Sequence, residues 1–423
     1  MTLEALHQLF LEFPNICTDS RKITDNCIFF ALKGDNFNGN AYAEEALKKG
    51  ASYAVVDEKR TDHNDQIIVV DDVLSTLQQL GQWHRDYCKA TVIALTGSNG
   101  KTTTKELIAS VLSRKFKIIA TKGNLNNHIG VPLTLLSITP ETDIAIVEMG
   151  ANHLKEIEFL CKLAKPDYGY ITNFGKAHLE GFGSVEGVIK AKGELYDYLI
   201  LNKKHIFFNG DDPIQTNRLH SYPHKSGYSD NKQYYPITFL DADPFVRLTV
   251  ENLTIQTQLV GRYNFTNCCA AILIGHYFKL TLDLIKQGIE NYSPQNNRSQ
   301  IIEKDGYQIV LDAYNANPTS MKLALENFKE LKASNKVVFL GDMFELGSSS
   351  EKEHQELSDL AISMNFDALF LVGENFYKTK NSLTKYRSFD ELAQYLKTTK
   401  FKKSTILIKG SRGMALERIL ELL

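Results

Sequence analysis

The residues best suited to chemistry lie in the run Thr-Gly-Ser-Asn-Gly-Lys-Thr-Thr-Thr at positions 96–104. Gly97 and Gly100 allow the backbone to approach phosphate oxygens, and the amides of a following helix N-terminus supply positive potential. Lys101 can reach the terminal phosphates of a nucleotide, and the Thr102 hydroxyl can bind Mg²⁺. The spacing therefore predicts a phosphate-binding loop.

The segments on either side of this loop support that interpretation. Residues 91–95 are β-branched and apolar, which is typical of a buried strand, and residues 105–112 carry apolar side chains at helical spacing. The general pattern has Gly where this chain has Leu95, so the loop is a shortened variant. The simpler alternative is a helix-opening turn that merely contains Gly and Lys.

Two further strand ends carry side chains that suit a nucleotide site. An apolar run over 143–150 predicts a buried strand ending near Glu148, and a carboxylate there is placed for a second Mg²⁺ contact. A strand over 167–173 leads into the Gly-rich segment 174–184, which contains His178. The alternatives are a solvated Glu and a solvated loop histidine.

Several other loops contain groups that can bind a polar ligand. Asn124, Asn126 and Asn127 follow a short strand at 118–121 and offer amide donors and acceptors. Arg21 and the loop 34–39 could hold a phosphorylated ligand, although a turn with a solvated Arg is the simpler interpretation.

The last third of the chain repeats the pattern of a strand followed by a polar loop. Strands are predicted at 307–312, 336–340, 368–372 and 405–408. Lys409 and Arg412 follow the last of these and form a candidate anion clamp; the alternative is an ordinary turn before a helix. We also expect Ser320 to cap a helix that runs to about Leu331, and a final helix after Gly413.

Alternating strands and helices predict an α/β fold with parallel sheets. A small α/β unit occupies residues 1 to about 85, helices are predicted at 41–49, 74–87, 185–199, 266–276 and 351–364, and residues 218–260 are β-rich. In the helix at 185–199 the charged residues Lys190, Lys192 and Glu194 are explained equally well by a solvated face. A third unit begins near Arg298.

Composition excludes several classes of protein. The chain has 423 residues, 43% hydrophobic and 23% charged, and this length predicts two to four domains. The net charge of −2 gives no basic face for nucleic acid or an anionic membrane. We expect no signal peptide and no membrane span. Six cysteines without Cys-x-x-Cys spacing favour a reducing cytoplasm.

Taken together, the loops resemble the Mur ligase family of peptidoglycan synthesis. The resemblance rests on the segments 19–21, 96–103, 314–318, 341–347 and 409–412, so it covers nearly the whole chain. Tyr-Asn-Ala-Asn-Pro at 314–318 and Gly-Asp-Met-Phe-Glu-Leu-Gly at 341–347 are similar to motifs of the member that adds D-alanyl-D-alanine. The Asp-Asn-Pro-Arg motif of a related member is not found. Tyr263 departs from the pattern, because the family often has His after Gly-Arg.

The resemblance implies a three-domain ligase. The first domain, residues 1–85, binds the UDP end of a substrate, and the second, a P-loop ATPase-like domain over residues 86–298, binds ATP. The third, a Rossmann-like domain over residues 299–423, closes over both. It implies ATP and Mg²⁺ as cofactors. It also implies UDP-N-acetylmuramoyl-tripeptide and D-alanyl-D-alanine as substrates, an acyl-phosphate intermediate, and a cytoplasmic monomer.

The resemblance also implies roles for individual residues, carried over position by position. ATP contacts are Gly97, Ser98, Asn99, Gly100, Lys101, Thr102, Thr103, Asn264, Arg298 and Asp312. Contacts to the UDP-substrate are Ser20, Arg21, Asn36, Asn124, Asn126 and Asn127. C-terminal contacts to substrate or phosphate are Tyr314, Asn315, Asn317, Lys409 and Arg412. Metal ligands are Thr102, Glu148, His178 and a carbamylated Lys192, and the catalytic set is Lys101, His178, Lys192 and Arg298.

Two other functions remain open from sequence. One is another amide ligase of the same architecture, such as the folylpolyglutamate type, against which the polar segment 19–21 and the additional N-terminal domain argue. The other is a nucleotide-switch protein, in which ATP hydrolysis drives motion and no bond is made. The loops that suit a second and a third ligand argue against it.

Overall fold

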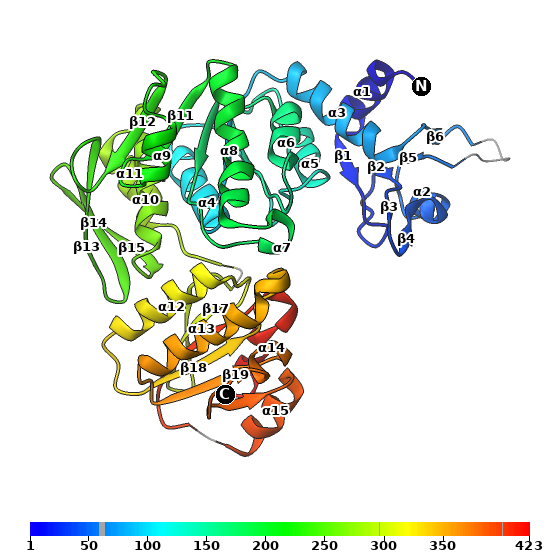
Figure 1. Cartoon of the computed structure of the whole chain (residues 1–423). Helices are drawn as coiled ribbons and strands as arrows, with labels where there is room; N and C mark the ends of the chain where they lie inside the picture. The colour runs from blue at the N-terminus through cyan, green and yellow to red at the C-terminus, as the bar shows by residue number, and fades with distance from the viewer. Residues whose placement is uncertain (59–63, 296, 400) are drawn as a thin grey trace. The chain divides into compact units, whose positions relative to one another are not determined.

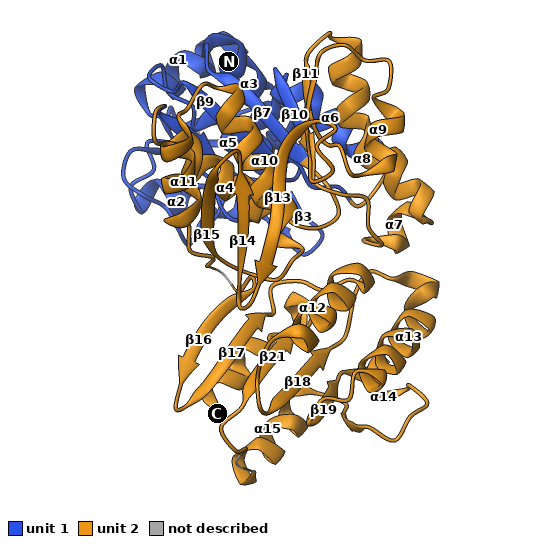
Figure 2. Cartoon of the chain, turned by 90° about the vertical axis from the view of Figure 1, so that its left-hand side faces the viewer, with its two compact units in different colours: residues 1–95, 116–151, 155–169 blue, residues 96–115, 152–154, 170–423 orange. Residues whose placement is uncertain are grey.

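The computed structural model describes residues 1–58, 64–295, 297–399 and 401–423. The chain forms two compact units, shown in different colours in Figure 2. Unit 1 contains Met1–Leu95, Phe116–Ala151 and Lys155–Gly169, and unit 2 contains Thr96–Lys115, Asn152–Leu154 and Tyr170–Leu423. The division passes through two strands, so each unit is described by itself.

Unit 1 begins with a four-stranded parallel sheet in the order β1-β2-β5-β6. Its strands are β1 (Asn15–Cys17), β2 (Cys27–Phe30), β5 (Tyr53–Val56) and β6 (Ile67–Val69). Side chains of α1 (Leu3–Glu12) and α3 (Val73–Tyr87) join one core cluster with this sheet, and α2 (Ala43–Lys48) joins a second. A short hairpin of β3 (Lys33–Gly34) and β4 (Phe37–Asn38), with η1 (Gly39–Tyr42), completes this part.

The second part of unit 1 carries parallel strands in the order β7-β9-β8. They are β7 (Thr91–Thr96), β8 (Ile118–Ala120) and β9 (Ile144–Glu148), with helices α5 (Gly130–Leu136) and α6 (Glu156–Ala164). Both β7 and β9 are almost entirely buried and apolar, which is typical of strands covered on both faces. Glu148 is therefore a buried carboxylate at the end of an apolar strand.

Unit 2 carries strands in the order β15-β14-β13-β12-β11-β10. The bounds are β10 (Tyr168–Ile171), β11 (His205–Asn209), β12 (Lys225–Ser229), β13 (Tyr235–Ala242), β14 (Phe245–Val250) and β15 (Leu253–Val260). The pairs β11·β12 and β12·β13 are parallel, whereas β13·β14 and β14·β15 are antiparallel. The helices are α4 (Lys101–Leu112), α7 (Leu179–Phe182), α8 (Val185–Leu201), α9 (Pro213–Arg218), α10 (Asn264–Tyr277) and α11 (Leu282–Glu290).

Residues from 300 onward in unit 2 form a six-stranded sheet in the order β16-β17-β21-β18-β19-β20, visible in Figure 1 in yellow to red. The strands are β16 (Gln300–Lys304), β17 (Tyr307–Asp312), β18 (Lys336–Gly341), β19 (Ala368–Val372), β20 (Thr384–Tyr386) and β21 (Thr405–Lys409). Only the β16·β17 pair is antiparallel among the described pairs. The helices are α12 (Pro318–Glu330), α13 (Ser350–Ser363), α14 (Glu374–Tyr377) and α15 (Phe389–Thr398), with 3₁₀ turns η2 (Gly347–Ser349), η3 (Arg412–Met414) and η4 (Leu416–Glu421).

The predicted α/β class with parallel sheets is confirmed, and β17 and β19 have the predicted bounds. Two local predictions are wrong. Asn317, not Ser320, caps α12, because Pro318 fits the first helical position and Ser320 completes a capping box. The final helix is a 3₁₀ segment, η4, that begins after Ala415, a residue with positive φ. Among the described residues no helix has the length and apolar character needed to cross a lipid bilayer.

Candidate active site

The predicted phosphate loop joins β7 to α4 through two glycines in left-handed conformations. Gly97 has φ +144° and Gly100 has φ +78°. A Cβ at Gly97 would lie 1.9 Å from the Thr172 hydroxyl oxygen, and a Cβ at Gly100 would lie 2.5 Å from the Asn267 amide oxygen. Both positions therefore require Gly for conformation and for space.

The segment after β10 holds the phosphate loop in shape. Asn99 N–H donates to Asn173 Oδ1 at 3.1 Å, and the Asn99 carbonyl accepts from Thr172 Oγ1 at 2.6 Å. Ser98 Oγ donates to the Gly175 carbonyl at 3.0 Å. These bonds fix the backbone between two glycines, so the loop is shaped before any ligand binds.

Two side chains of this loop, Lys101 and Thr102, lie in the first turn of α4. Lys101 Nζ donates to the Gly97 carbonyl at 2.7 Å, so its ammonium lies over the loop. Thr102 is buried in the first turn of α4. The loop therefore presents a cation and a hydroxyl at a helix N-terminus, where anions bind favourably.

A chain of buried amides joins α10 to α4 beside the loop. Asn264 Nδ2 donates to the Val260 carbonyl at 2.7 Å, and Asn264 Oδ1 accepts from Asn267 Nδ2 at 2.8 Å. Asn267 Oδ1 accepts from the Thr104 hydroxyl at 3.0 Å. The predicted nucleotide-contact residue Asn264 is thus 3% exposed and already bonded through both ends of its amide.

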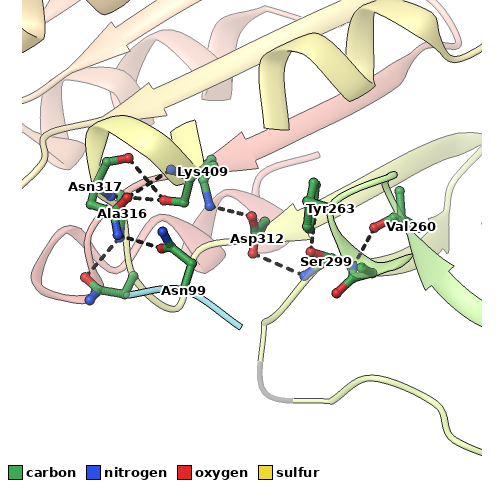
Figure 3. Close-up of polar contacts among 11 residues, drawn as sticks. Asn99, Val260, Tyr263, Ser299, Asp312, Ala316, Asn317 and Lys409 are labelled. Carbon is green, nitrogen blue, oxygen red and sulfur yellow. Dashed lines mark hydrogen bonds and ion pairs between the residues drawn. The ribbon is translucent and has the colours of Figure 1, made fainter. Parts of the chain in front are cut away.

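The segment 314–320 contacts the phosphate loop within unit 2, as Figure 3 shows. Asn317 Nδ2 donates to Asn99 Oδ1 at 2.7 Å, and Lys176 N–H donates to Thr319 Oγ1 at 3.0 Å. Asn99 Nδ2 is buried and has no hydrogen-bond partner among the described residues. A buried amide donor without a partner is costly, and a phosphate oxygen would satisfy it.

Two arginines approach the ring of Tyr314. The Arg298 guanidinium carbon lies 3.5 Å from the ring centroid and the Arg412 carbon 5.3 Å from it. The Arg298 Nε is buried and has no hydrogen-bond partner in the part of the chain that the structure describes. Cation–π contacts orient the guanidiniums without neutralising them, so they remain able to bind an anion.

Asp312 ends β17 and is held at both carboxylate oxygens. Oδ1 accepts from the Ser299 N–H at 3.2 Å, and Oδ2 forms an ion pair with the Lys409 ammonium. The parallel β17·β21 register places Asp312 opposite Lys409, which is 2% exposed. The predicted anion-clamp residue Lys409 therefore contacts a carboxylate of its own sheet.

His178 also has a carboxylate partner. It has φ +51° and precedes α7, and its Nδ1 lies 2.5 Å from Glu345 Oε2. The hydrogen bond to His178 lowers the pKa of Glu345 below its usual value despite its partial burial. Nearby, Lys176 Nζ lies 2.7 Å from Glu353 Oε1. The Nδ1 contact orients the imidazole and leaves Nε2 as the nitrogen that can bind a ligand.

Lys192 lies on α8 and its side chain is fully buried. Its ammonium nitrogen is 5.0 Å from the Phe182 ring centroid. The solvated charged face considered from sequence is therefore wrong for Lys192, although Lys190 on the same helix is exposed.

Unit 1 brings together two of its predicted site residues. Asn126 Nδ2 donates to Glu148 Oε1 at 2.7 Å, and the Glu148 N–H donates to the Thr121 hydroxyl at 3.0 Å. Asn127 Oδ1 accepts from the Gly130 N–H at 2.9 Å and so orders the start of α5. Asn124 is exposed.

The remaining predicted residues of unit 1 lie on other segments. Ser20 is buried, whereas Arg21 is exposed and lies 2.8 Å from Asp19. That pairing lowers the pKa of Asp19 to about 2. Asn36 is exposed between β3 and β4.

Family models match three consecutive regions of the chain. The model described as "Mur ligase family, catalytic domain" matches residues 12–92, "Mur ligase middle domain" matches 95–275, and "Mur ligase, glutamate ligase domain" matches 297–412. The chain belongs to the Mur ligase family.

Relatives within the Mur ligase family match over nearly their whole length. The UDP-N-acetylmuramoyl-tripeptide–D-alanyl-D-alanine ligase of Bacillus subtilis (strain 168) is 34% identical over 421 residues, covering 96% of this chain and 92% of that protein. The protein with the same name from Escherichia coli (strain K12) is 34% identical, covering 96% and 93%.

Solved structures of Mur ligases are similar in fold. MurF from Acinetobacter baumannii matches with a TM-score of 0.87 at 29% identity, over 99% of this chain and 98% of that one. MurF from Thermotoga maritima, solved in complex with ADP, matches with a TM-score of 0.84 at 27% identity, over 97% of both chains. The three-domain Mur ligase architecture therefore extends through this chain.

Sequence reasoning missed residues that support the site of this Mur ligase from outside the motifs. Thr172 and Asn173 shape the phosphate loop, Ser299 contacts Asp312, and Thr319 contacts Lys176. Glu345 lies within the segment 341–347 used for the resemblance, and an acidic residue in a Gly-bounded loop was the one available signal for a histidine partner.

Proposed function

We propose that this Mur ligase joins D-alanyl-D-alanine to UDP-N-acetylmuramoyl-tripeptide with hydrolysis of ATP to ADP and phosphate. The proposal is supported by relatives of that name, which are 34% identical and cover 96% of the chain. Within the structure, it is carried by the Asn317–Asn99 contact, which places the segment 314–318 against the phosphate loop.

The reaction requires an activated carboxylate, because a free carboxylate has no good leaving group. A carboxylate oxygen of the tripeptide attacks the γ-phosphorus of ATP, the bond to the ADP oxygen breaks, and an acyl phosphate forms. The amine of D-alanyl-D-alanine then attacks the acyl carbon. The tetrahedral intermediate collapses with loss of phosphate, and the attacking nitrogen gives up a proton.

Two anions meet in the first step, so the site needs positive charge that is fixed in place. We assign this task to Lys101 on the phosphate loop and to Arg298. The second guanidinium beside Tyr314, that of Arg412, adds to the same field. Positive groups that are held in place before the reaction act without reorganising during it.

The phosphate loop residues Gly97, Ser98, Asn99, Gly100, Lys101, Thr102 and Thr103 are proposed to bind the ATP phosphates. The unpartnered donor Asn99 Nδ2 supports this, since a phosphate oxygen is an acceptor. Asp312 is proposed to accept hydrogen bonds from hydroxyl or amino groups of the nucleotide, because a carboxylate repels phosphate. Asn264 shapes the loop through Asn267 and is proposed to lie beside the nucleotide.

Mg²⁺ is the proposed metal, and the available donors fit it. Mg²⁺ is usually bound through one or two carboxylates together with substrate phosphates and water. Thr102 is buried at the loop, and Glu148 is a buried carboxylate oriented by Asn126. His178 is oriented by Glu345. We propose Thr102, Glu148, His178 and a carbamylated Lys192 as ligands; bound Mg²⁺ would neutralise phosphate charge.

Unit 1 is proposed to bind the UDP-substrate. Arg21 is a cation suited to a diphosphate, and the remaining candidates are polar residues on three connecting segments, Ser20, Asn36, Asn124, Asn126 and Asn127. Tyr314, Asn315, Asn317, Lys409 and Arg412 are proposed to act from the C-terminal domain. We also propose domain boundaries near residues 85 and 298, and a monomeric protein in the cytoplasm.

The test measures phosphate release from MgATP with the wild-type protein. We expect release that requires both UDP-N-acetylmuramoyl-tripeptide and D-alanyl-D-alanine, and a product with the mass of the UDP-pentapeptide. Omitting each substrate in turn is the control. Release that needs neither substrate would indicate a nucleotide hydrolase, and a preference for another amine or for a folate acceptor would contradict the assigned substrates.

A further inference from the structure

A line of polar contacts leads from Tyr263 to Asp312, as Figure 3 shows. The Tyr263 hydroxyl lies 2.7 Å from the Ser299 hydroxyl, and the Ser299 N–H donates to Asp312 Oδ1 at 3.2 Å. Asp312 Oδ2 forms the ion pair with Lys409. Four residues that are far apart in sequence thus share one chain of contacts.

Ser299 has a backbone conformation that is unusual for a residue with a Cβ atom. It is 6% exposed and has φ +49°, and it directly precedes β16. A non-Gly residue in this conformation persists only where its surroundings hold it. The two bonds that hold it come from Tyr263 on one side and Asp312 on the other.

Tyr263 is itself fixed in place. Its ring lies over Gly261, where an added Cβ would be 2.4 Å from the ring. Burial raises the pKa of the Tyr263 phenol, and the negative charge of Asp312 raises it further, so the hydroxyl keeps its proton. A protonated phenol and a serine hydroxyl can hydrogen-bond in either direction.

We propose that Tyr263 and Ser299 are positioning residues for the nucleotide, which act by fixing the carboxylate of Asp312. The proposal rests on the proposed function, in which Asp312 contacts ATP. The Ser299 N–H and the Lys409 ammonium each engage one carboxylate oxygen, and a carboxylate has further acceptor sites that stay available to a ligand. The hydrogen bond between Tyr263 and Ser299 holds Ser299 in place and thereby fixes the orientation of these acceptor sites.

The experiment compares Tyr263→Phe, Ser299→Ala and the double variant with wild type. Phe keeps the ring over Gly261 and removes only the hydroxyl. We expect the KM for ATP to rise about threefold to tenfold, as for loss of one buried hydrogen bond, with kcat within about twofold. The KM values for both other substrates should not change. The double variant should match the single ones, because both remove the same hydrogen bond.

Tyr222→Phe is the matched control, since the Tyr222 hydroxyl donates to the Lys204 carbonyl at 2.5 Å elsewhere in the same unit. Its KM for ATP should equal that of wild type. Ser299→Gly, which removes the hydroxyl but relieves the positive φ, should behave as Ser299→Ala does. Titration with ADP alone gives a second readout, in which the same variants should bind more weakly.

The proposal is overturned if Tyr263→Phe binds ADP and ATP as wild type does, or if kcat and the thermal midpoint fall while the KM for ATP stays unchanged. Effects that add in the double variant would also overturn it. Failure of the proposed function has a different signature: wild type would form no UDP-pentapeptide, while the ADP titration would still report on Tyr263 and Ser299.

Discussion

Asn317 performs two tasks at the residue scale. Its Oδ1 accepts from the Ser320 N–H and caps α12, and its Nδ2 donates to Asn99 on the phosphate loop. The two tasks use different atoms of one amide. They can therefore be separated by a single substitution.

We predict that Asn317→Asp keeps the stability of the protein and reduces its ligase activity. Asp is as good a cap as Asn and favours the helix N-terminus, so the thermal midpoint should hold. The donor to Asn99 is lost and a carboxylate faces an amide oxygen, so the segment 314–318 should move away from the phosphate loop, and kcat/KM should fall roughly fivefold to a hundredfold, which corresponds to about 1–3 kcal/mol of lost transition-state stabilisation. Steady-state kinetics with thermal melts check this, and Asn317→Ala is the control that loses both the helix cap and the hydrogen bond to Asn99. An unchanged kcat/KM in Asn317→Asp would contradict it.

Sequence predicts residue types better than residue partners. Lys101, Thr102 and Asn317 were found because motifs have fixed spacing. The pairing of Asp312 with Lys409 depends on which strands are neighbours in the C-terminal sheet. Strand order is a non-local property, so no spacing along the chain encodes that pair.

At the element scale, the join between β7 and α4 depends on the segment after β10. The Thr172 hydroxyl donates to the Asn99 carbonyl and also lies where a Cβ of residue 97 would be. Thr172 cannot move away without breaking that bond. The strand-loop-helix unit is therefore shaped by a third element.

We predict that Gly97→Ala abolishes ATP-dependent ligation, with a loss of at least about a hundredfold, because the loop can no longer hold its phosphate-binding shape. The steric conflict should also cost about 1–3 kcal/mol of stability. Gly306→Ala is the matched control: φ is +87°, but the nearest atom is Lys403 Cε at 3.2 Å, near the end of a flexible side chain. Phosphate-release assays and thermal melts of both variants check this. Equal activity in the two would refute the steric argument.

Elements with strong periodicity were predicted closely, and short elements were not. The apolar strands β17 and β19 follow directly from their composition. Helix α6 begins after Lys155, a residue with positive φ, and η4 begins after Ala415, another such residue. Residue type does not predict these starts, because Lys and Ala do not favour the left-handed region.

At the scale of the whole molecule, a buried histidine pair makes the stability of the fold depend on pH. His7 on α1 and His84 on α3 lie 3.1 Å apart, Nε2 to Nδ1, and His84 Nε2 lies 2.7 Å from the Ile138 carbonyl. Burial lowers the pKa of both, and for His7 the neighbouring His84 lowers the pKa further. The folded chain therefore favours two neutral imidazoles.

We predict that the thermal midpoint falls as the pH drops below about 6.5, the pKa of histidine in the unfolded chain. The folded pKa values lie below the unfolded one, so the unfolded state binds protons first and stability is lost with acid. His7→Gln keeps a donor to His84 but does not titrate, so its midpoint should fall less between about pH 7.5 and about pH 5.5. Thermal melts at both pH values check this. Identical losses in wild type and variant would exclude the pair as the source.

The three-domain architecture was predicted because the motifs are spread from residue 19 to residue 412, and family models match three consecutive regions. Charge and composition supplied only the class of protein. The burial of Lys192 was not predictable, because charged residues spaced along a helix usually indicate a solvated face. The position of Lys192 beside the Phe182 ring is known only from the structure.

All six cysteines are buried, and burial raises the pKa of Cys268 and Cys269 far above the usual range of a thiol. Thiolate is the reactive form, so maleimide reagents should leave the folded chain almost unlabelled. A single cysteine introduced at Leu201, which is 82% exposed, would then be the preferred attachment point. The native sequence can therefore carry a fluorophore or spin label at position 201 without removal of its own cysteines.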